Sequence, residues 1–377
     1  MEPGLSSITT VLTGAAAIAR PSDGRNLTEA CHRVKALAPI SPSRDRLTPM
    51  TDFPAKRPGW LYRLFLLWLK RAAGGRDGLP LPESLTPESL AALRRMTGMP
   101  SFPQALSSLQ IRSWREISLP CGEGIRPARL YRPRGPVRGL ILFLHGGGFV
   151  HCDLVSHHGI CCRLACHSGA MVLSLDYRLA PEHPFPAAVD DGWDALLWLH
   201  EQAEVRDLPI AVCGDSAGGN LAAVLARRAG AAGLERVVAQ LLYYPTVSGL
   251  LSPVTRETYA QGYMLTARLL DWYGRQYIRS DCDMLDPNFA PVFASDLAQA
   301  PPAMIVTAGF DPLRGEGELY ARLLREAGVE ARLVCYRRAI HGFLNFYAAV
   351  VEGRQALRVG GRYLRERFAA WQEDRIS

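Results

Sequence analysis

From residue 140 onward, short apolar runs alternate with longer amphipathic segments, and this alternation restricts the folds open to the chain. The apolar runs have the length of buried strands and lie at 140–144, 171–175, 210–213, 237–243, 304–307 and 331–335. The amphipathic segments have the length of helices and lie at 156–167, 188–200, 217–228 and 313–327, with a last one ending near 371. Two antiparallel strands, at 111–120 and 126–133, are predicted before the series. The pattern predicts an α/β fold with a mostly parallel, doubly wound sheet that helices cover on both faces.

The composition is that of a globular protein with one large domain and additions, or with two smaller domains. Of the 377 residues, 48% are hydrophobic and 21% are charged, which is enough apolar material for a sizeable core. The net charge of +7 comes largely from scattered arginines, so we predict no nucleic-acid partner. Nine cysteines at irregular spacing do not indicate a full set of disulfides, and they favour a reducing, cytoplasmic location.

The first part of the chain differs from the rest. Residues 1–49 combine an apolar stretch with a polar, proline-containing one, and they lack the positively charged start of a signal peptide. We predict a disordered extension there, with export as the alternative. Residues 60–69 predict an apolar helix that is too short to span a bilayer. We predict that it packs on the rest of the protein, and contact with a membrane surface is the alternative. The face expected to pack carries Trp60, Leu61, Leu64, Phe65, Trp68 and Leu69.

Histidines and cysteines are concentrated between residues 151 and 167, which raises the question of a metal site. Their spacing does not match the paired Cys and His motifs of structural zinc sites, so we predict no metal. Cys162 and Cys166 are four residues apart, as on one face of a helix. We predict both to be small apolar residues of the core.

The stretch GDSAGGN at 214–220 has the features of a nucleophile on a tight turn. Ser216 stands between Gly214 and Gly218, directly after a predicted strand and directly before a predicted helix. Small neighbours allow the sharp backbone turn that exposes such a serine, and the start of a helix favours developing negative charge. Taken alone, the motif is also compatible with a purely structural turn.

A serine nucleophile needs a base and a group that orients the base. Asp311 follows the strand at 304–307 and His341 follows the strand at 331–335. Both are therefore expected at the same carboxyl edge of the sheet as Ser216. Singly, Asp311 is compatible with a helix N-cap and His341 with a structural loop histidine. Their joint placement predicts a catalytic group of Ser216, Asp311 and His341.

Three consecutive glycines follow the strand at 140–144, where bulky side chains would keep a ligand away from the backbone. Gly146, Gly147 and Gly148 are expected at the same edge of the sheet as Ser216. Their N–H groups, with that of Ala217, predict an oxyanion hole. A phosphate-binding loop is the alternative, but GxGxxG and GKS/GKT motifs are missing. We predict that His145 braces the loop through hydrogen bonds.

Five motifs, in this order, resemble those of the hormone-sensitive-lipase-like branch of the α/β-hydrolases, which includes many bacterial esterases. They are HGGGF (145–149), DYRLAPEHPFPAA (176–188), GDSAGGN (214–220), DPLRGEG (311–317) and IHGF (340–343), and the resemblance covers about residues 60–370. It implies an α/β-hydrolase fold with a helical cap. The hydrolysis that it implies requires neither a metal nor an organic cofactor. It also implies Ser216 as nucleophile, Asp311 as orienting acid and His341 as base.

The resemblance implies a division of the chain and an activity. Segments 50–110 and 248–288 would form the cap, and 111–247 with 289–372 the hydrolase core. The expected activity is that of a serine carboxylesterase acting on small-molecule esters with short to medium acyl chains. Glu182 would support the loops at the site, and a homodimer is left open. Residues expected to contact the substrate are Phe149, Asp215, Trp272, Tyr273 and Phe343.

The chain departs from the family pattern near the predicted site. His151 and Cys152 stand where the family has an apolar residue and glycine, and Gly315 replaces an acidic residue. These departures leave substrate preference open, and they would bring ring nitrogens and a thiol to the mouth of the pocket. The alternative functions are an amide, lactone or formamide hydrolase, a lipid hydrolase acting at a membrane surface, and a non-catalytic small-molecule receptor.

Overall fold

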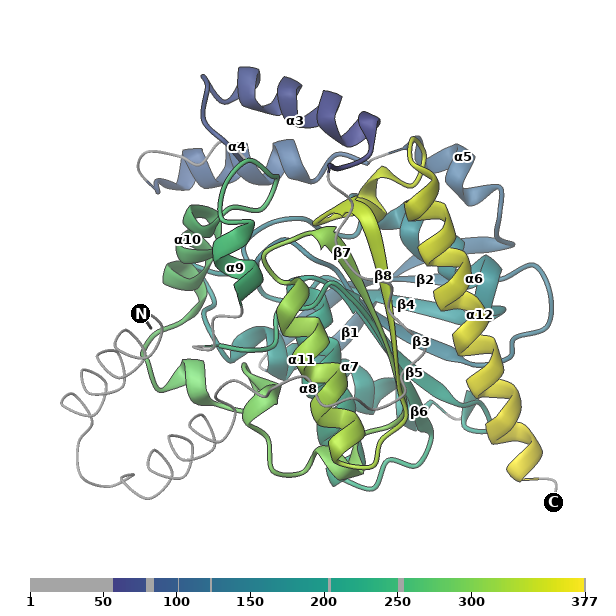
Figure 1. Ribbon diagram of the computed structural model, residues 1–377. Helices are drawn as coiled ribbons and strands as arrows, with labels where there is room; N and C mark the ends of the chain where they lie inside the picture. Colours follow the sequence, from purple (N-terminus) through teal and green to yellow (C-terminus); the bar gives the residue numbers. More distant parts are fainter. Residues whose placement is uncertain are drawn as a thin grey trace, which may run out of the picture.

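The computed structural model describes residues 57–78, 85–100, 102–122, 124–202, 205–249 and 254–375. Figure 1 shows a central sheet between two layers of helices, with a further group of helices over one end. The extension predicted at 1–49 lies outside the described residues.

One sheet of eight strands forms the centre of the molecule, in the order β1-β2-β4-β3-β5-β6-β7-β8. β1 pairs antiparallel with β2, and β2 with β4, while all other neighbours are parallel. This arrangement confirms the predicted α/β fold with a mostly parallel sheet. The strands are Ser113–Cys121 (β1), Gly124–Arg132 (β2), Leu140–Leu144 (β3), Met171–Leu175 (β4), Ile210–Asp215 (β5), Val237–Tyr243 (β6), Ala303–Phe310 (β7) and Ala331–Ile340 (β8).

Helices cover both faces because the central strands are apolar on both sides. Along β3, Leu142 and Leu144 belong to one buried cluster, whereas Ile141 and Phe143 belong to another on the opposite face. The first cluster includes residues of α7 (Ala187–Glu201), α8 (Ala217–Ala231) and α11 (Arg314–Glu326), and the second those of α6 (His158–Ser168) and α12 (Val351–Asp374). The sheet is therefore fully enclosed at its centre.

Two predicted boundaries shift for local reasons. α6 begins at His158 rather than at 156 because the Asp153 side chain accepts the N–H groups of Val155 and Ser156 and forms a turn before the helix. β8 continues to Ile340 rather than 335, since pairing with β7 extends through a bulge near Ala308. It is an edge strand with a half-exposed middle, so its polar residues obscure the strand in the sequence.

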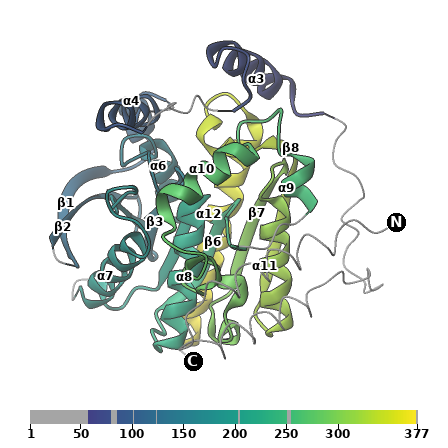
Figure 2. The same cartoon turned by 90° about the vertical axis from the view of Figure 1, so that its left-hand side faces the viewer.

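Short helices lie over one end of the sheet, where α3 and α4 are at the top of both Figure 1 and Figure 2. α4 starts with a capping box between Thr86 and Ser89. α10 starts at Ala267, although the apolar pattern begins earlier, because the Thr266 side chain caps it by accepting the N–H of Leu269. The shorter helices are α3 (Trp60–Ala72), α4 (Pro87–Thr97), α5 (Gln104–Ser108), α9 (Val254–Thr258) and α10 (Ala267–Tyr277). Single helical turns among the described residues are η2 (Asp283–Leu285), η3 (Pro291–Phe293), η4 (Leu297–Gln299) and η5 (Phe343–Phe346).

α3 packs on the protein through only part of the face that was predicted, since Leu61, Phe65 and Leu69 face the protein. Tyr62 and Leu69 are buried, and Phe65 contacts the ring of Phe346 with centroids 4.7 Å apart. Trp60 and Trp68, in contrast, are 64% and 62% exposed. The prediction fails for the two tryptophans and for Leu64, which is also exposed. The helix is apolar almost all round, so its sequence alone does not decide which side is covered. None of the helices in the described residues is both long and apolar enough to span a bilayer.

Candidate active site

Ser216 lies at a sharp turn between β5 and α8. Its backbone has φ 54° and ψ −117°, a strained conformation that L residues rarely adopt. The neighbouring glycines make the turn feasible. A Cβ on Gly214 would lie 2.2 Å from the carbonyl oxygen of Gly218, and a Cβ on Gly218 would lie 2.0 Å from that of Leu144. The missing side chains allow the backbone to press against β3 and to present Ser216 at the edge of the sheet.

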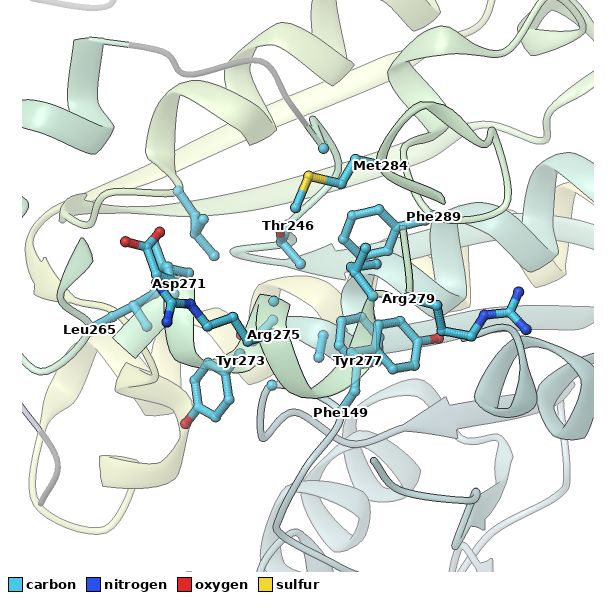
Figure 3. A pocket seen from close by; sticks show the side chains of 18 of the residues that line it. Phe149, Thr246, Leu265, Asp271, Tyr273, Arg275, Tyr277, Arg279, Met284 and Phe289 are labelled. Carbon is cyan, nitrogen blue, oxygen red and sulfur yellow. The ribbon is translucent and has the colours of Figure 1, made fainter. Parts of the chain in front are cut away.

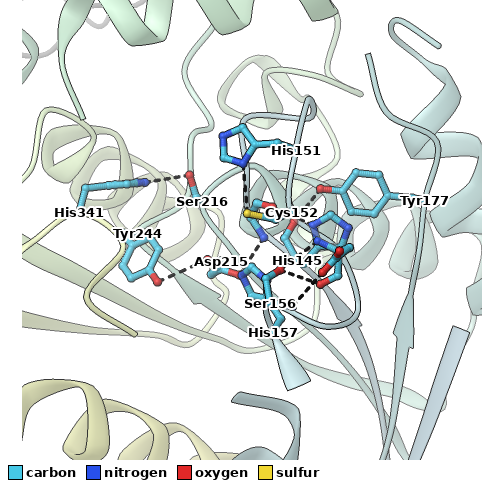
Figure 4. Close-up of polar contacts among 12 residues, drawn as sticks. His145, His151, Cys152, Ser156, His157, Tyr177, Asp215, Ser216, Tyr244 and His341 are labelled. Atoms are coloured by element: carbon cyan, nitrogen blue, oxygen red, sulfur yellow. Dashed lines mark hydrogen bonds and ion pairs between the residues drawn. The ribbon is translucent and has the colours of Figure 1, made fainter. Parts of the chain in front are cut away.

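Two residues that follow later strands are hydrogen-bonded to each other and to Ser216. His341 Nε2 lies 2.9 Å from Ser216 Oγ, and His341 Nδ1 lies 2.7 Å from Asp311 Oδ2. Asp311 directly follows β7 and His341 directly follows β8, so the parallel strands bring both to one edge. The other carboxylate oxygen of Asp311 accepts the N–H of Leu313. The three residues predicted as a catalytic group are therefore in direct contact, and Figure 4 shows the hydrogen bond between His341 and Ser216.

The glycine loop after β3 differs from the prediction at its first residue. The N–H of Gly146 donates to Asp215 Oδ1 at 2.9 Å. It is therefore already used, and the prediction of Gly146 as an oxyanion donor is wrong. The N–H groups of Gly147, Gly148 and Ala217 have no acceptor within the described part of the chain, and all three residues line a hollow beside Ser216. These three amides remain as donors for a negatively charged oxygen.

Asp215, predicted to contact substrate, holds the glycine loop in place. Its carboxylate is buried, with His157 Nε2 3.2 Å from Oδ1 and the hydroxyl of Tyr244 donating to Oδ2. Burial by itself raises the pKa of Asp215, but the His157 ring and the Gly146 N–H outweigh it and lower the pKa below its ordinary value. Asp215 is therefore ionised at neutral pH, and its negative charge stabilises the hydrogen bond from the Gly146 N–H of the glycine loop.

His145 braces the same loop, as predicted. Its ring is buried, and Nδ1 donates to the carbonyl oxygen of Gly146 at 2.7 Å. The ring stacks on Tyr177 with centroids 4.4 Å apart, and the Tyr177 hydroxyl donates to the His145 carbonyl oxygen. Burial lowers the pKa of His145 to about 4, so the ring is neutral at neutral pH. It supports the loop as a hydrogen-bonding residue, and it faces away from Ser216 (Figure 4).

A further supporting residue, Glu316, was missed by the sequence argument. Its buried carboxylate accepts the N–H groups of Val247 and Ser248 and the hydroxyl of Thr246 through Oε2. Burial raises the pKa of Glu316 above its ordinary value. Thr246 lines the hollow beside Ser216, so Glu316 fixes one wall of the site. In the sequence, the only indication of this role was that Glu316 belongs to the DPLRGEG motif. The motif did not reveal which loop the carboxylate of Glu316 would hold.

Two hollows open on either side of Ser216. The large hollow has a volume of about 450 Å³ and the small hollow about 260 Å³. Ser216, Gly148, Leu265 and Tyr273 line both. In the large hollow, three aromatic rings lie close together, and charged side chains lie on both sides of them (Figure 3). The rings belong to Phe149, Tyr277 and Phe289, and the charged side chains include Asp271 and Arg275.

The residues predicted to contact substrate separate into two groups. Phe149, Tyr273 and Asp215 line the hollows, whereas Trp272 and Phe343 line neither. For the latter two, the structure contradicts the prediction. Phe343 is fully buried against the rings of Tyr244 and Tyr336. The rings of Trp272 and Tyr273 are in contact. Adjacent residues of a helix point in directions about 100° apart, so Trp272 does not face the hollows that Tyr273 lines.

The His and Cys residues after the glycine loop are dispersed among separate environments. His151, Cys152 and His157 line the small hollow, as the departures from the family pattern suggested. No group of three or more metal-binding side chains occurs within the described residues. Cys162 is buried but Cys166 is exposed, so the core prediction is wrong for Cys166. Four residues turn the helix by about 40° beyond a full turn, which carries Cys166 out of the buried face.

Glu182 is bonded to α4, one of the helices that lie over the end of the sheet. Both of its carboxylate oxygens accept from the Arg94 guanidinium of α4, at 2.8 and 2.7 Å. Arg94 also donates to the carbonyl oxygens of Val150 and Ala180. These contacts agree with the expected supporting role of Glu182. The hydrogen bonds from Arg94 lower the pKa of Glu182 below its ordinary value, so this carboxylate is ionised at neutral pH.

Comparison with known proteins gives consistent matches. The pattern of the α/β-hydrolase fold family matches residues 141–345. The carboxylic ester hydrolase LipN of Mycobacterium tuberculosis is 46% identical over 284 residues, which cover 72% of this chain and 74% of that protein. The ethyl acetate hydrolase of Pseudomonas putida is 37% identical over 254 residues, covering 64% of this chain and 79% of that protein.

Solved structures resemble the chain over most of its length. An esterase of Pyrobaculum calidifontis superimposes with a TM-score of 0.73 at 40% identity, covering 82% of this chain and 98% of that one. The thermostable carboxylesterase EstE1, cloned from a metagenomic library, has a TM-score of 0.68 at 37% identity, covering 74% of this chain and 97% of that one.

Proposed function

The chain belongs to the α/β-hydrolase fold family, in its hormone-sensitive-lipase-like branch, and from this premise we propose that it is a serine carboxylesterase with Ser216 as its nucleophile. The observation that carries the proposal is the hydrogen-bonded chain from Ser216 through His341 to Asp311. Relatives named as carboxylic ester, ethyl acetate and aryl ester hydrolases favour ester hydrolysis over the amide, lactone and receptor alternatives.

In the first half of the reaction, Ser216 Oγ attacks the ester carbonyl carbon while His341 Nε2 takes its proton. The contact of 2.9 Å is within the range required for this transfer. Asp311 accepts from Nδ1, so it fixes the tautomer in which Nε2 is free to act as a base, and it stabilises the imidazolium that forms. His341 then protonates the leaving alcohol, which leaves an acyl group on Ser216.

In the second half, water attacks the acyl-enzyme, and His341 again acts as the base. The negative oxygen that develops in both halves is bound by the N–H groups of Gly147, Gly148 and Ala217. These donors are held in advance of the reaction by the loop network around Asp215 and His145. Preorganised donors of this kind are each worth about 10²–10³ in rate.

We assign the segments 50–110 and 248–288, as far as they are described, to a cap over the site. Support comes from α10, whose residue Tyr273 lines both hollows, and from α4, whose residue Thr97 lines the small one. Hollows of about 450 and 260 Å³ suit small esters with short to medium acyl chains. The eight cysteines in the described residues are free thiols, which supports a reducing compartment such as the cytoplasm.

The proposal is tested by hydrolysis of p-nitrophenyl esters from acetyl to palmitoyl, with Ser216→Ala as the test variant. Ser118→Ala, an exposed serine on β1, is the matched control. We expect activity that peaks at short or medium chains, is lost in Ser216→Ala and is retained in Ser118→Ala. A fluorophosphonate should add covalently to Ser216, as detected by peptide mass spectrometry. Folded wild-type protein with neither hydrolysis nor labelling would refute the proposal.

A further inference from the structure

Tyr273 of α10 lies directly on the glycine loop. A Cβ on Gly148 would come within 2.3 Å of the Tyr273 Cδ1 atom, so the aromatic ring packs against the bare backbone at this position. Gly148 is one of the three residues whose N–H groups are placed to bind the oxyanion. The ring of Tyr273 is thus in contact with the part of the loop that is closest to the reaction.

Tyr273 also lies where the two hollows meet. It lines both of them, together with Ser216, Gly148 and Leu265. The hollows differ in chemistry on its two sides. The large hollow is lined by charged side chains from Arg256, Arg275, Arg279, Asp271 and Asp281. The small hollow is lined by apolar side chains from Met99, Met264, Leu265, Leu269 and Phe346, and also by polar side chains that include His151, His157 and Asp215.

A hydrogen bond fixes the Tyr273 ring in this position. Its hydroxyl lies 2.5 Å from His151 Nε2, and His151 Nδ1 lies 3.2 Å from the Cys152 sulfur. Burial lowers the pKa of His151 to about 3, so the ring is neutral and the bond does not depend on a charge near neutral pH. His151 and Cys152 are two of the residues at which this chain departs from the family pattern. The wall is therefore fixed by a contact built from this chain's own residues.

His341 indicates which part of an ester enters each hollow. It lines the small hollow but not the large one. Since His341 protonates the leaving alcohol, the alcohol part must lie on the His341 side of Ser216. The acyl part then extends into the large hollow, which aromatic rings and charged side chains line.

We propose that Tyr273, held by His151, is a specificity-determining wall that sizes the two parts of the ester separately. This inference rests on the proposed esterase function. The substrate class that fits is an ester of a small alcohol with a longer acyl group, which can carry polar substituents. Because the same contact joins α10 to the glycine loop, the hydroxyl of Tyr273 also positions the oxyanion donor at Gly148.

The experiment compares two series of esters by pH-stat: ethyl esters from acetate to octanoate, and acetates from ethyl to octyl. For the wild type, kcat/KM should fall at shorter length in the alcohol series than in the acyl series. Tyr273→Ala joins the hollows, and it should raise kcat/KM for hexyl acetate relative to ethyl acetate by about tenfold. Trp272→Ala is the matched control on the same helix, and it should leave this ratio unchanged.

The hydrogen bond is tested separately from the wall. Tyr273→Phe and His151→Ile each remove the hydrogen bond between these residues but keep an aromatic ring at position 273. Each should therefore lower kcat for ethyl acetate by about threefold to tenfold, with little change in KM. The double variant should lose no more than either single variant, since both remove the same interaction. Additive losses would overturn the role of the hydrogen bond.

The outcomes distinguish this inference from the proposed function. An active wild type whose ratio of hexyl to ethyl acetate is unchanged in Tyr273→Ala would overturn the wall alone. A wild type that hydrolyses no ester would overturn the esterase and the wall together. If Tyr273→Ala does not fold, as judged by thermal melting, Tyr273→Leu shortens the wall while keeping an apolar side chain and provides the same comparison.

Discussion

The edge of the sheet and the helix that covers it place their residues at the same site by different means. Ser216, Asp311 and His341 are the first or nearly the first residues after three parallel strands, so the sheet itself sets their positions. Tyr273 comes from the middle of α10 and depends on side-chain contacts with Gly148 and His151. The first group is held by backbone hydrogen bonds of the core, and the second by a few contacts between the proposed cap and the core.

This difference indicates which properties are robust. A residue placed by strand order survives many changes in its surroundings, because the sheet is buried on both faces. A residue placed by the cap can change its contacts with one or two substitutions. We therefore expect reaction chemistry to be governed at the sheet edge and ester preference in the cap. The following predictions are arranged to test that division, from the largest expected effect to the smallest.

The largest effect is expected at the sheet edge. His341→Ala removes the base, and Ser216→Ala removes the nucleophile, so each should lower kcat by a factor on the order of 10⁴–10⁶. The double variant should be no worse than the more impaired single variant, because the residues act as a unit. Steady-state kinetics and thermal melting would check this. A double variant that is markedly slower than both single variants would show that the residues work independently.

The next effect concerns the backbone of the glycine loop. Gly147→Ala should lower kcat by about 10²–10³, because its Cβ would meet the His151 carbonyl oxygen at 2.0 Å and displace the donors. Gly328→Ala is the matched control: its φ is also positive, +84° against +118°, but a Cβ there meets nothing within 4 Å. Both variants carry backbone strain, so equal losses of activity would contradict a specific role for the loop.

A third effect appears in stability rather than activity. Burial raises the pKa of Asp176, which follows β4, from 3.8 to about 6. The folded state therefore holds this proton more tightly than the unfolded state, and stability from this group is lost as the pH rises from about 4 to about 6. Asp176→Asn should increase the free energy of unfolding by about 1–3 kcal/mol above pH 6 and have little effect below pH 4. Urea denaturation at both pH values checks the difference, and an equal change at both would argue against the titration.

The smallest effect is expected where α4 of the cap meets the core. The Arg94–Glu182 pair is partly exposed, at 30% and 47%, so Glu182→Gln should cost less than about 1 kcal/mol. Arg94→Ala should cost more, because it also removes donors to the Val150 and Ala180 carbonyl oxygens. Thermal melts of the two variants give the comparison. A larger loss in Glu182→Gln would mean that the ion pair, rather than the backbone contacts, holds α4 in place.

The elements that the sequence predicted well are those buried in the centre of the sheet. β3, β4 and β6 occur at their predicted positions, because a buried parallel strand appears as an uninterrupted apolar run. β8 was cut short because an edge strand carries polar residues on its exposed side. The packing face of α3 and the exposure of Cys166 could not be predicted, since both depend on which neighbour covers a helix.

The amino-acid sequence by itself determined the α/β fold, the order of the strands along the chain and the types of residue at the sheet edge. It did so because strand periodicity, the glycines around Ser216 and the residues after each strand are local features. Only the tertiary structure decided that Gly146 donates to Asp215, that Glu316 holds the Thr246 loop and that Tyr273 bonds to His151. Each of these contacts joins residues 69 to 122 positions apart, and local patterns carry no information on pairs that meet only after the sheet and the cap have assembled.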